Sequence, residues 1–581
     1  MSIISRARSG QQPAEPAPDQ PTGNQTAGAQ RGPARRALGI ALTVLAAVLV
    51  YLALVVPDSV AHAKEGTNVA TGFVRLPIEA ILGGTLLLVA PQRRRRLIAA
   101  LLGLGLAVLT VLKIFNAGFL TVLGRRFNPV LDPPLFRDGF NALTETNGRA
   151  TAVAAAIGAV LLSVAVIGLV TLAVVRLSSV TARYAGPARR ALLVLSVAWI
   201  ALALTGVSPY PNNPVASDSA VALAKTTAKS IPAAIRDQKA FERATENDPF
   251  HNVPANQLVA GLDGHDFVIG VVESYGRSAL SNPKMSAIVD PVLTDGTRTL
   301  AAKGYYAKSG WLTSSTYGGG SWLAHGSFQS GLWIDSQQRY RQLTASDRLT
   351  ITSAFHNAGR PTYGLEPGNT TAWPEAKFYG YDTVYDSRNL GYAGPRFGWS
   401  RMPDQYTLAQ FQKDVYGKAH QPLMAEITMT SSHEPWTPIP SMVDWDQIGD
   451  GKIYDPMIAG ATDRHALWKS SANTQAQYAK SIAYSVQTLI SWVEKYGDDN
   501  LVLVFFGDHQ PFSIVSGNNA NHEIPITVVA HDKAVLDKIS GWNWTDGLQP
   551  AANAPIWKMS DFRDKFFTAY GSEPAPPAKA R

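Results

Sequence analysis

Residues 501–511 read LVLVFFGDHQP. The apolar run from Leu501 to Phe506 predicts a strand buried on both faces, as in parallel sheets. The run ends at a glycine, and Asp508 and His509 follow side by side. In open α/β sheets, functional groups lie just beyond the carboxyl ends of the strands. An acid and an imidazole at that position are candidate metal ligands, although a turn aspartate beside an incidental histidine would give the same letters.

Two earlier segments end in the same way. FVIGVVE (267–273) is an apolar run that ends at Glu273, and LMAEITMTSSHEPW (423–436) is another, whose polar turn carries His433. A stretch with apolar residues at helical spacing, 478–497, directly precedes the opening strand. Strand, helix and strand in this order predict a parallel sheet with crossover helices. The carboxyl ends of these strands are therefore expected to bring a glutamate, a histidine and the Asp-His pair to one edge.

A glycine-rich segment between the first two strands carries a candidate nucleophile. It reads SSTYGGGSWLAHGSFQSG (314–331), and Ser321 follows the glycines at a point where a helix can begin. Glycines let the backbone approach a ligand closely. A hydroxyl at a helix N-terminus lies among unpaired N–H groups and the positive end of the helix dipole, which favours an anionic substrate. A flexible loop in which Ser321 is an ordinary helix cap is the alternative interpretation.

Together these segments supply a set of oxygen and imidazole ligands. The set is Glu273, Ser321, Asp508 and His509. Such ligands suit Mn²⁺, Mg²⁺ or Zn²⁺. A divalent metal bound to a serine hydroxyl lowers its pKa and polarises a phosphoryl or sulfuryl oxygen of the substrate. The sequence therefore predicts attack by Ser321 and a covalent intermediate.

The composition places part of the chain in a membrane. The chain has 581 residues, too many for one ordinary core, and 46% of them are hydrophobic while 17% are charged. It contains no cysteine, which excludes disulfides and thiolate metal sites. The net charge is +8, but the basic residues cluster beside apolar runs, at 31–36, 92–96 and 186–190. That distribution indicates membrane topology and argues against a nucleic-acid-binding surface.

Five apolar stretches approach the length of a transmembrane helix. They cover residues 38–56, 74–91, 97–121, 151–175 and 190–208. The second is the weakest, because it is short and Glu79 interrupts it. The most basic loops fall on one side, which predicts a cytoplasmic N-terminus and an extracytoplasmic position for everything after about residue 209. The arginines of the 122–150 loop conflict mildly with this orientation.

These patterns divide the chain into regions. The regions are a disordered cytoplasmic tail (1–36), a transmembrane domain (37–209), a juxtamembrane linker (210–258), an extracytoplasmic catalytic domain (259–540) and a C-terminal segment with a disordered tail (541–581). The first is rich in Pro, Gly, Gln, Ala and Ser, which cannot form a core. In the linker, Ala222-Leu223-Ala224 has the small-x-small pattern of signal peptidase sites, although an ordinary helical linker is the favoured interpretation.

The series of motifs resembles the lipoteichoic acid synthase group. The series is VVESYG, the glycine-rich hydroxyl motif, AFHNAG (354–359), FYGYDTVYD (378–386), TSSHEPW and FFGDHQP. Members of that group are membrane-embedded phosphoglycerol transferases of the sulfatase-like, alkaline-phosphatase superfamily. The resemblance covers roughly residues 38–535. It implies about five transmembrane helices followed by an α/β sulfatase-like domain with a mainly parallel central sheet.

The resemblance also implies roles for single residues. The four ligands named above correspond to the metal site and nucleophile of the group, and His356, Trp373 and His433 correspond to its substrate contacts. The metal of the group is typically manganese, so Mn²⁺ is favoured, and the donor is phosphatidylglycerol. His522 in NHEIPI resembles a His-x-Pro segment of the related phosphoethanolamine transferases, which would support a second metal or the leaving group. A structural histidine is the alternative there.

The chain departs from the group in the substrate pocket. The nucleophile is Ser321 instead of threonine, with Thr316 as a nearby rival, and His325 replaces an acidic residue. The arginine expected after the tryptophan is absent. Arg360 or Lys377 would have to hold the phosphate, unless both are solvated surface charges. These changes question phosphoglycerol as the transferred group more than they question phosphoryl transfer.

The expected function is a membrane-anchored phosphotransferase. Sulfatases oxidise the first residue of Cys/Ser-x-Pro-x-Arg, whereas Ser321 begins Ser-Trp-Leu-Ala-His, so an unmodified hydroxyl and phosphoryl chemistry are predicted. Ser321 would take a phosphoglycerol- or phosphoethanolamine-type group from a membrane phospholipid and pass it to a cell-envelope glycan or lipid. A phosphodiesterase or phosphatase with the same site is the alternative. A non-catalytic envelope module is disfavoured, because all four ligand types are present.

Overall fold

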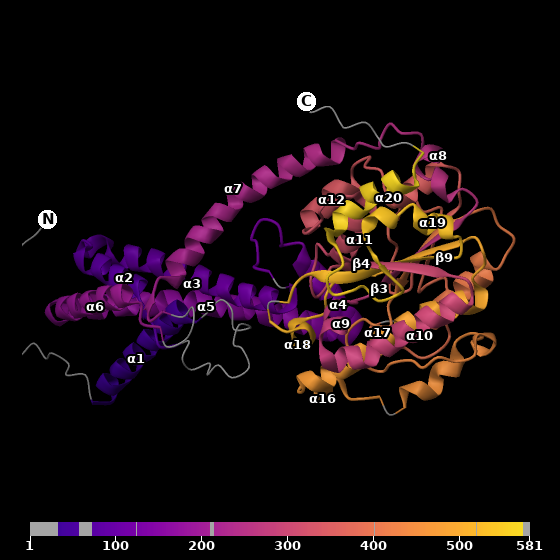
Figure 1. The fold of residues 1–581 in the computed structure, drawn as a ribbon. Coiled ribbons are helices and arrows are strands. Elements are labelled where there is room, and N and C mark those ends of the chain that lie inside the picture. The colour runs from indigo at the N-terminus through magenta and orange to yellow at the C-terminus, as the bar shows by residue number, and fades with distance from the viewer. Residues whose placement is uncertain are drawn as a thin grey trace, which may run out of the picture.

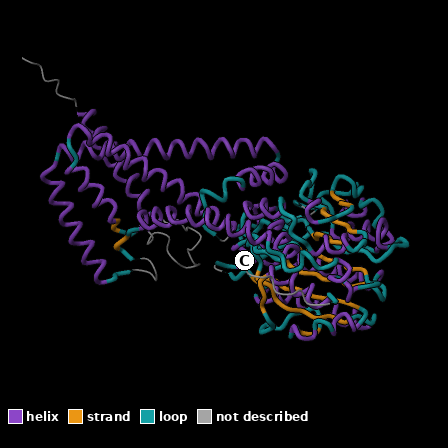
Figure 2. The backbone as a smooth tube through the Cα atoms, turned by 90° about the horizontal axis from the view of Figure 1, so that it is seen from above, coloured by secondary structure: helices purple, strands orange, loops and turns teal. Residues whose placement is uncertain are grey.

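The computed structural model describes residues 33–56, 73–123, 125–208, 214–399, 401–459, 461–518 and 520–572. Most of the predicted tail 1–36, and the last residues of 541–581, lie outside these ranges. The described chain has a helical N-terminal region and an α/β C-terminal domain. The long helix α7 (Ser219–Glu246) connects these two parts (Figure 1). Apart from one short pair, the strands are confined to the C-terminal domain (Figure 2).

The N-terminal region is built from helices that suit a lipid environment. They are α1 (Pro33–Val55), α2 (Ile78–Val89), α3 (Gln92–Leu123), α4 (Leu135–Asn147), α5 (Arg149–Arg183) and α6 (Ala185–Thr205). Of these, α1, α3, α5 and α6 are long and apolar enough to cross a membrane. Many of their large apolar side chains are exposed, as expected of helices that face lipid.

The second predicted span differs from the other four. The stretch 74–91 folds into the short strand β1 (Leu76–Pro77) and then α2, which has only 12 residues. A helix needs roughly 20 residues to cross the hydrocarbon core. The strand β1 pairs with β2 (Ala216–Ser217), so this stretch is tied to the beginning of the linker. The structure thus shows four full-length apolar helices among the described residues instead of five.

The predicted linker contains α7, which is anchored at both ends. At its start, Glu79 Oε1 accepts the backbone N–H groups of Ala220 and Val221 at 2.8 and 3.0 Å. Nearer its end, Asp237 Oδ2 accepts a hydrogen bond of 2.9 Å from Nε of Arg339, which lies in α12 (Gln337–Thr344). The Ala222-Leu223-Ala224 motif lies inside this helix, as the helical-linker interpretation requires.

The C-terminal domain contains one nine-stranded sheet. Its order is β10 (Thr545–Asp546), β4 (Tyr306–Thr313), β9 (Glu523–Ala530), β8 (Leu501–Gly507), β3 (Asp266–Val272), β7 (Met424–Met429), β5 (Thr362–Glu366) and β6 (Thr383–Asp386), with β11 (Ile556–Lys558) beside β4. The strands from β8 through β6 are parallel, and β9 is antiparallel to its neighbours β8 and β4. The predicted, mainly parallel central sheet is confirmed.

Helices cover both faces of this sheet. One core contains residues of α10 (Pro283–Ala302) and α17 (Ser471–Tyr496), and the other contains residues of α11 (Ser321–Ser330), α13 (Ile351–Asn357) and α20 (Phe562–Tyr570). Along β3, Val268 belongs to the first core and Ile269 to the second. Both faces of the strand are therefore apolar, which explains the unbroken hydrophobic run in the sequence. Since α20 is part of this core, the domain extends beyond the predicted boundary at residue 540.

Candidate active site

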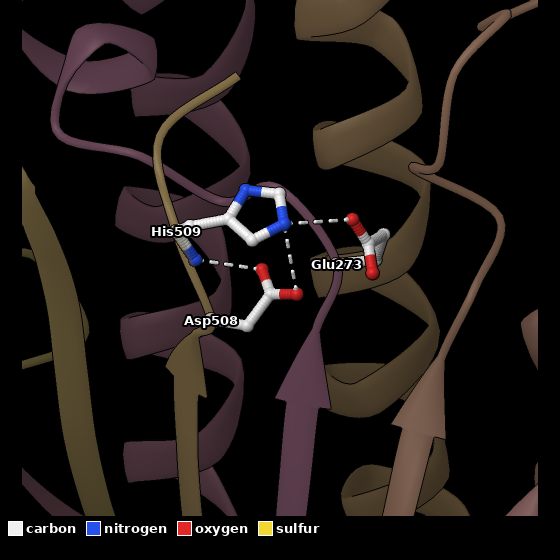
Figure 3. A group of neighbouring side chains, drawn as sticks. All are labelled: Glu273, Asp508 and His509. Atoms are coloured by element: carbon white, nitrogen blue, oxygen red, sulfur yellow. Dashed lines mark hydrogen bonds and ion pairs between the residues drawn. The ribbon is translucent and has the colours of Figure 1, made fainter. Parts of the chain in front are cut away.

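Glu273, Asp508 and His509 meet at the carboxyl edge of the sheet (Figure 3). Glu273 directly follows β3, and the other two directly follow β8, which pairs with β3 in parallel. All three side chains are buried. His509 Nε2 lies 3.4 Å from Glu273 Oε1 and 3.4 Å from Asp508 Oδ2. The parallel pairing of two adjacent strands is thus what brings these residues together.

The donor atoms of this cluster suit a divalent cation. One ligand atom of each residue lies within 4.8 Å of the others. Asp508 Oδ1 accepts the N–H groups of Ser274 and His509, both at 2.7 Å, but the buried Oδ2 has no hydrogen-bond partner in the described part of the chain. His509 Nδ1 lies 2.9 Å from the carbonyl oxygen of Gln510, so it donates there and leaves the Nε2 lone pair toward the carboxylates. A buried oxygen without a donor and a free imidazole nitrogen fit a metal site.

The two carboxyl groups of the cluster differ in acidity. Burial, together with the charge of Glu273, raises the pKa of Asp508. Burial also acts to raise the pKa of Glu273, but the nearby imidazoles of His509 and His433 outweigh it and lower that pKa. Two carboxylates this close resist joint ionisation, and a bound divalent cation would relieve their repulsion.

Ser321 is the hydroxyl that the fold brings to this cluster. Its Oγ donates a hydrogen bond of 2.9 Å to Glu273 Oε2 and lies 3.4 Å from His509 Nε2. It is the first residue of α11, and no side chain caps this end of the helix. The glycines at 318–320 precede it with φ values of 68°, 150° and 80°, which other residues rarely adopt. The sharp glycine turn therefore places the hydroxyl at the N-terminus of α11, where the positive end of the helix dipole suits an anion.

Thr316 and His522 lie close to the cluster without touching Ser321. The hydroxyl of Thr316 is buried and has no hydrogen-bond partner among the described residues. His522 directly precedes β9, and its ring centroid lies 5.5 Å from that of Tyr317. Burial, with a contribution from the charge of His509, lowers the pKa of His522. The geometry favours Ser321 over Thr316 as the nucleophile, because only Ser321 contacts two members of the cluster.

His433 faces the cluster from the turn after β7. Its Nδ1 lies 2.6 Å from the carbonyl oxygen of Glu434, and its ring stacks on Trp399 with the ring centroids 4.0 Å apart. The buried Asp404 supports this turn by accepting the N–H of Ser431 at 2.8 Å. These contacts orient the imidazole, whose charge lowers the pKa of Glu273. The sequence analysis did not identify Trp399, because a single tryptophan in a loop carries no distinguishing pattern.

A second group of ionisable side chains adjoins the first. It consists of His325, Glu366 and Glu426, whose ligand atoms also lie within 4.8 Å of one another. His325 Nδ1 lies 2.8 Å from Glu426 Oε1. The other oxygen of Glu426 accepts hydrogen bonds from the side-chain amide of Gln329 and, at 2.9 Å, from the hydroxyl of Tyr381. His325, which sequence analysis identified only as a departure from the family pattern, is thus the centre of a buried ionic network.

The network shifts the pKa values of its members. Burial acts to lower the pKa of His325, but the hydrogen bond and charge of Glu426, with help from Glu366, raise it to about 9. Burial raises the pKa of Glu366 to about 7, against the charge of His325. Neither glutamate was identified from the sequence. Glu426 could have been identified, because a carboxylate within a buried apolar strand requires a hydrogen-bonding or charged partner.

The predicted aromatic contact Trp373 lies at the border of this network. Its ring packs on Tyr379 and Tyr381, with centroid distances of 5.3 and 5.9 Å. Since Tyr381 bonds to Glu426, Trp373 is one side chain away from the charged group. Lys377 lies on α14 (Ala376–Tyr379) and is exposed, which matches the alternative of a solvated charge.

His356 and Arg360 are not brought to the site. His356 Nδ1 lies 2.9 Å from Asp382, whose other carboxylate oxygen accepts the N–H of the first residue of β5. Arg360 binds the carbonyl oxygen of Leu262 and the carboxylate of Asp263, just before β3. Both sets of contacts lie at the amino edge of the sheet, opposite to the cluster. Among the predicted substrate-side residues, His356 and Arg360 are therefore two that the structure does not bring to the cluster.

The membrane region reaches the nucleophile loop. A Cβ added at Gly318 would lie 2.1 Å from the carbonyl oxygen of Val122, at the end of α3, and 2.9 Å from the ring of Phe512. Figure 1 shows α4, which follows this end of α3, beside the C-terminal domain. The turn before Ser321 is therefore packed directly against the end of α3.

Comparison with known proteins identifies one family model. Residues 265–527 match the model described as Sulfatase. The search of curated proteins finds no match. One similar solved structure is the integral membrane protein lipooligosaccharide phosphoethanolamine transferase A (EptA) from Neisseria meningitidis, with 15% identity, coverage of 91% of this chain and 95% of that chain, and a TM-score of 0.44.

Two further solved structures are similar over a smaller part of the chain. The lipoteichoic acid synthase LtaP from Listeria monocytogenes is 14% identical, covers 53% of this chain and 72% of its own, and has a TM-score of 0.35. The phosphoglycerol transferase GacH from Streptococcus pyogenes is 14% identical, covers 57% of this chain and 80% of its own, and has a TM-score of 0.34.

Proposed function

Because residues 265–527 match the Sulfatase family model and follow helices that can cross a membrane, we propose that this protein is a membrane-anchored phosphotransferase. It moves a phosphoglycerol- or phosphoethanolamine-type group from a membrane phospholipid to a cell-envelope glycan or lipid. The observation that carries the proposal is the Ser321 hydroxyl at the start of α11, bonded to Glu273 Oε2 at 2.9 Å and 3.4 Å from His509 Nε2. In this proposal the N-terminus is cytoplasmic and the C-terminal domain is extracytoplasmic.

Phosphoryl chemistry fits this nucleophile better than sulfate ester hydrolysis. A sulfatase would need proline and arginine two and four residues after Ser321 to form its oxidised nucleophile. Leu323 and His325 occupy these positions here, and both side chains make structural contacts. Leu323 is buried in a hydrophobic cluster, and His325 is paired with Glu426. An unmodified serine hydroxyl therefore remains as the attacking group.

Glu273, Asp508 and His509 would hold a divalent cation, with Mn²⁺ favoured and Mg²⁺ or Zn²⁺ as alternatives. When bound, the cation supplies positive charge that stabilises the Ser321 alkoxide and the phosphoryl oxygens. Glu273 Oε2 orients the hydroxyl by accepting its hydrogen bond. The backbone at the start of α11, where Ser321 and Trp322 lie, binds the remaining phosphate oxygens.

The reaction has two displacements at phosphorus. In the first, Ser321 Oγ forms a bond to phosphorus, the bond to the diacylglycerol oxygen breaks, and that oxygen receives a proton. In the second, an acceptor hydroxyl attacks phosphorus, the bond to Oγ breaks, and Oγ regains a proton. His433 is placed to exchange these protons, because its Nδ1 is held by the Glu434 carbonyl and its Nε2 remains free among the described residues.

The test measures the first displacement. Full-length protein in lipid nanodiscs is supplied with phosphatidylglycerol or phosphatidylethanolamine and Mn²⁺, and released diacylglycerol is quantified. Ser321→Ala should lower the rate by at least about 10³-fold. Mass spectrometry of the wild type should show the phosphoalcohol group on the peptide that contains Ser321.

Thr316→Ala is the control, since it removes a nearby buried hydroxyl and leaves the contacts of Ser321 intact. Loss of activity in Thr316→Ala but not in Ser321→Ala would contradict the assignment. No diacylglycerol from either lipid would contradict the transferase. Release of glycerol phosphate or phosphoethanolamine without any transfer to added acceptors would instead identify the hydrolase.

A further inference from the structure

A cavity of about 420 Å³ lies where the membrane region meets the C-terminal domain. Its lining residues are Asn147, Glu434, Arg464, Trp468 and Phe512. Asn147 is the last residue of α4, whereas the other four belong to the C-terminal domain. The volume falls within the range of roughly 300–1,000 Å³ that is typical of small-molecule sites. The cavity therefore needs both parts of the chain for its walls.

Two residues of the cavity lining, Glu434 and Phe512, connect it to the candidate active site. Glu434 directly follows His433, whose ring faces the metal ligands. Phe512 lies three residues after His509, and its ring approaches the glycine turn that precedes Ser321. A molecule in this cavity consequently contacts the neighbour of His433 in the chain and the ring that packs against the glycine turn.

The lining has the chemistry of a site for a neutral, hydroxyl-rich ring. Trp468 and Phe512 present aromatic rings with centroids 6.2 Å apart, and such faces pack against the apolar C–H face of a ring. Arg464 donates to Glu434 Oε1 at 2.9 Å, so the guanidinium is already neutralised and gives no free charge for an anion. Arg464, Glu434 and the exposed amide of Asn147 offer hydrogen-bond donors and acceptors at the rim.

The polar side chains of the lining separate the possible occupants. A sugar hydroxyl can exchange hydrogen bonds with Arg464, Glu434 and the exposed amide of Asn147. An acyl chain offers no donor or acceptor and would leave these groups unsatisfied, so a sugar fits the cavity better than a lipid tail.

We propose that this cavity is the acceptor subsite and that it binds a neutral sugar ring. The proposal rests on the proposed function and names its acceptor class. The hydroxyl of the bound sugar attacks the phosphorus on Ser321, a new oxygen–phosphorus bond forms, and the bond to Ser321 Oγ breaks. The proton of the sugar hydroxyl ends on Oγ, which restores the free serine. Because Asn147 comes from the segment between α3 and α5, the acceptor binds only when the membrane region is docked.

The test uses the full-length protein in nanodiscs without sugar detergents. Saturation-transfer NMR follows the binding of methyl α-glucoside, methyl α-mannoside, methyl β-galactoside and maltose. At least one sugar should bind saturably to the wild type. Trp468→Ala and Asn147→Ala should weaken that binding at least tenfold, whereas Trp468→Phe should retain most of it. Since Asn147 is exposed, its substitution provides a variant that does not depend on core packing.

The matched control is Gln487→Ala, an amide-to-alanine change in a separate groove beside α17. Sugar binding and diacylglycerol release should both remain unchanged in Gln487→Ala, whereas Trp468→Ala and Asn147→Ala lose sugar binding. The proposal is overturned if no sugar saturates, if both variants bind like the wild type, or if phospholipid displaces the sugar. Normal sugar binding without any diacylglycerol release would overturn the proposed function and leave the sugar site standing.

Discussion

Asp508 has the environment that most directly implies a cation. Its buried Oδ2 has no partner in the described chain, and its pKa is raised by burial and by Glu273. For the wild type, Mn²⁺ at a concentration of 100 times its Kd should stabilise the folded protein by about 2.7 kcal/mol, or roughly 5–10 °C in Tm. We expect Asp508→Asn to abolish this stabilisation. Without metal, the variant should be at least as stable as the wild type, because it no longer buries an unpaired carboxylate.

Thermal unfolding with EDTA or Mn²⁺, together with metal content by mass spectrometry, checks this expectation. Asp404→Asn is the matched control, since Asp404 is an equally buried carboxyl group whose oxygens accept hydrogen bonds from Ser431 and Ser485. It should lower Tm by a similar amount with and without Mn²⁺. An Asp508→Asn protein that still gains stability from Mn²⁺ would show that this residue is not a ligand.

His325 should make the stability of the domain depend on pH. Its pKa is about 9 in the folded protein, above the ordinary value of 6.5, because Glu426 and Glu366 outweigh burial. The stabilisation is fully present below pH 6.5 and is lost as pH rises through about 9. Its size is on the order of 3 kcal/mol. Urea unfolding between pH 6 and 10 should therefore show a decline that His325→Gln removes, and parallel curves for the two proteins would refute the ionic pair.

The positions of the predicted substrate-side residues depend on strand boundaries. A histidine in AFHNAG predicted a substrate contact, but His356 lies on α13 and turns toward Asp382 at the wrong edge of the sheet. Glu366 occupies the carboxyl end of β5 instead, as Glu273 does after β3. The order of the motifs located the strands correctly. However, the edge of the sheet that a side chain reaches depends on where its strand begins and ends. The boundaries of a strand as short as β5 cannot be determined from the sequence.

At the scale of elements, buried strands made the cluster of Glu273, Asp508 and His509 predictable. The apolar runs that form β3 and β8 are long and end in glycine or an acid, so their carboxyl ends were clear from the sequence. A parallel sheet was predictable from α17, which precedes β8, whereas the direct pairing of β3 with β8 is known only from the structure. The contacts of α11 were not predictable, because they depend on how the helix packs across β7 and β5. The network around His325 was missed for that reason.

The glycine turn before Ser321 is the element whose substitution should be most damaging. Gly318→Ala places a Cβ 2.1 Å from the Val122 carbonyl oxygen at a φ of 68°. Strain and overlap together should cost about 2–4 kcal/mol and displace the end of α3. Gly264→Ala has a similar φ of 82° with nothing within 4 Å, so it should cost only about 1–2 kcal/mol. Calorimetry of both variants checks the difference, and equal losses would show that the contact with α3 is unimportant.

At the scale of the whole molecule, helix length separates the active site from the bilayer. The 32 residues of α3 span about 48 Å, whereas the hydrocarbon core is about 30 Å thick. Lys113 of α3 donates to carbonyl oxygens at the end of α1, so the last ten residues of α3 continue beyond α1 toward the C-terminal domain. The site is thus held above the membrane by the protruding end of α3 and by α7, two supports that composition alone did not predict.

If α7 positions the site over its lipid donor, loosening both of its ends should affect lipid substrates selectively. Glu79→Ala with Asp237→Ala removes the contact to α2 and the ion pair with Arg339. Turnover of phospholipid in nanodiscs should fall by about 10- to 100-fold, because the donor is no longer aligned with the site. Hydrolysis of a water-soluble diester such as bis(p-nitrophenyl) phosphate should stay within about twofold, because the chemical groups are untouched. Glu79→Gln retains an acceptor oxygen and should behave like the wild type, whereas equal losses on both substrates would mean that α7 supports the fold and not the alignment.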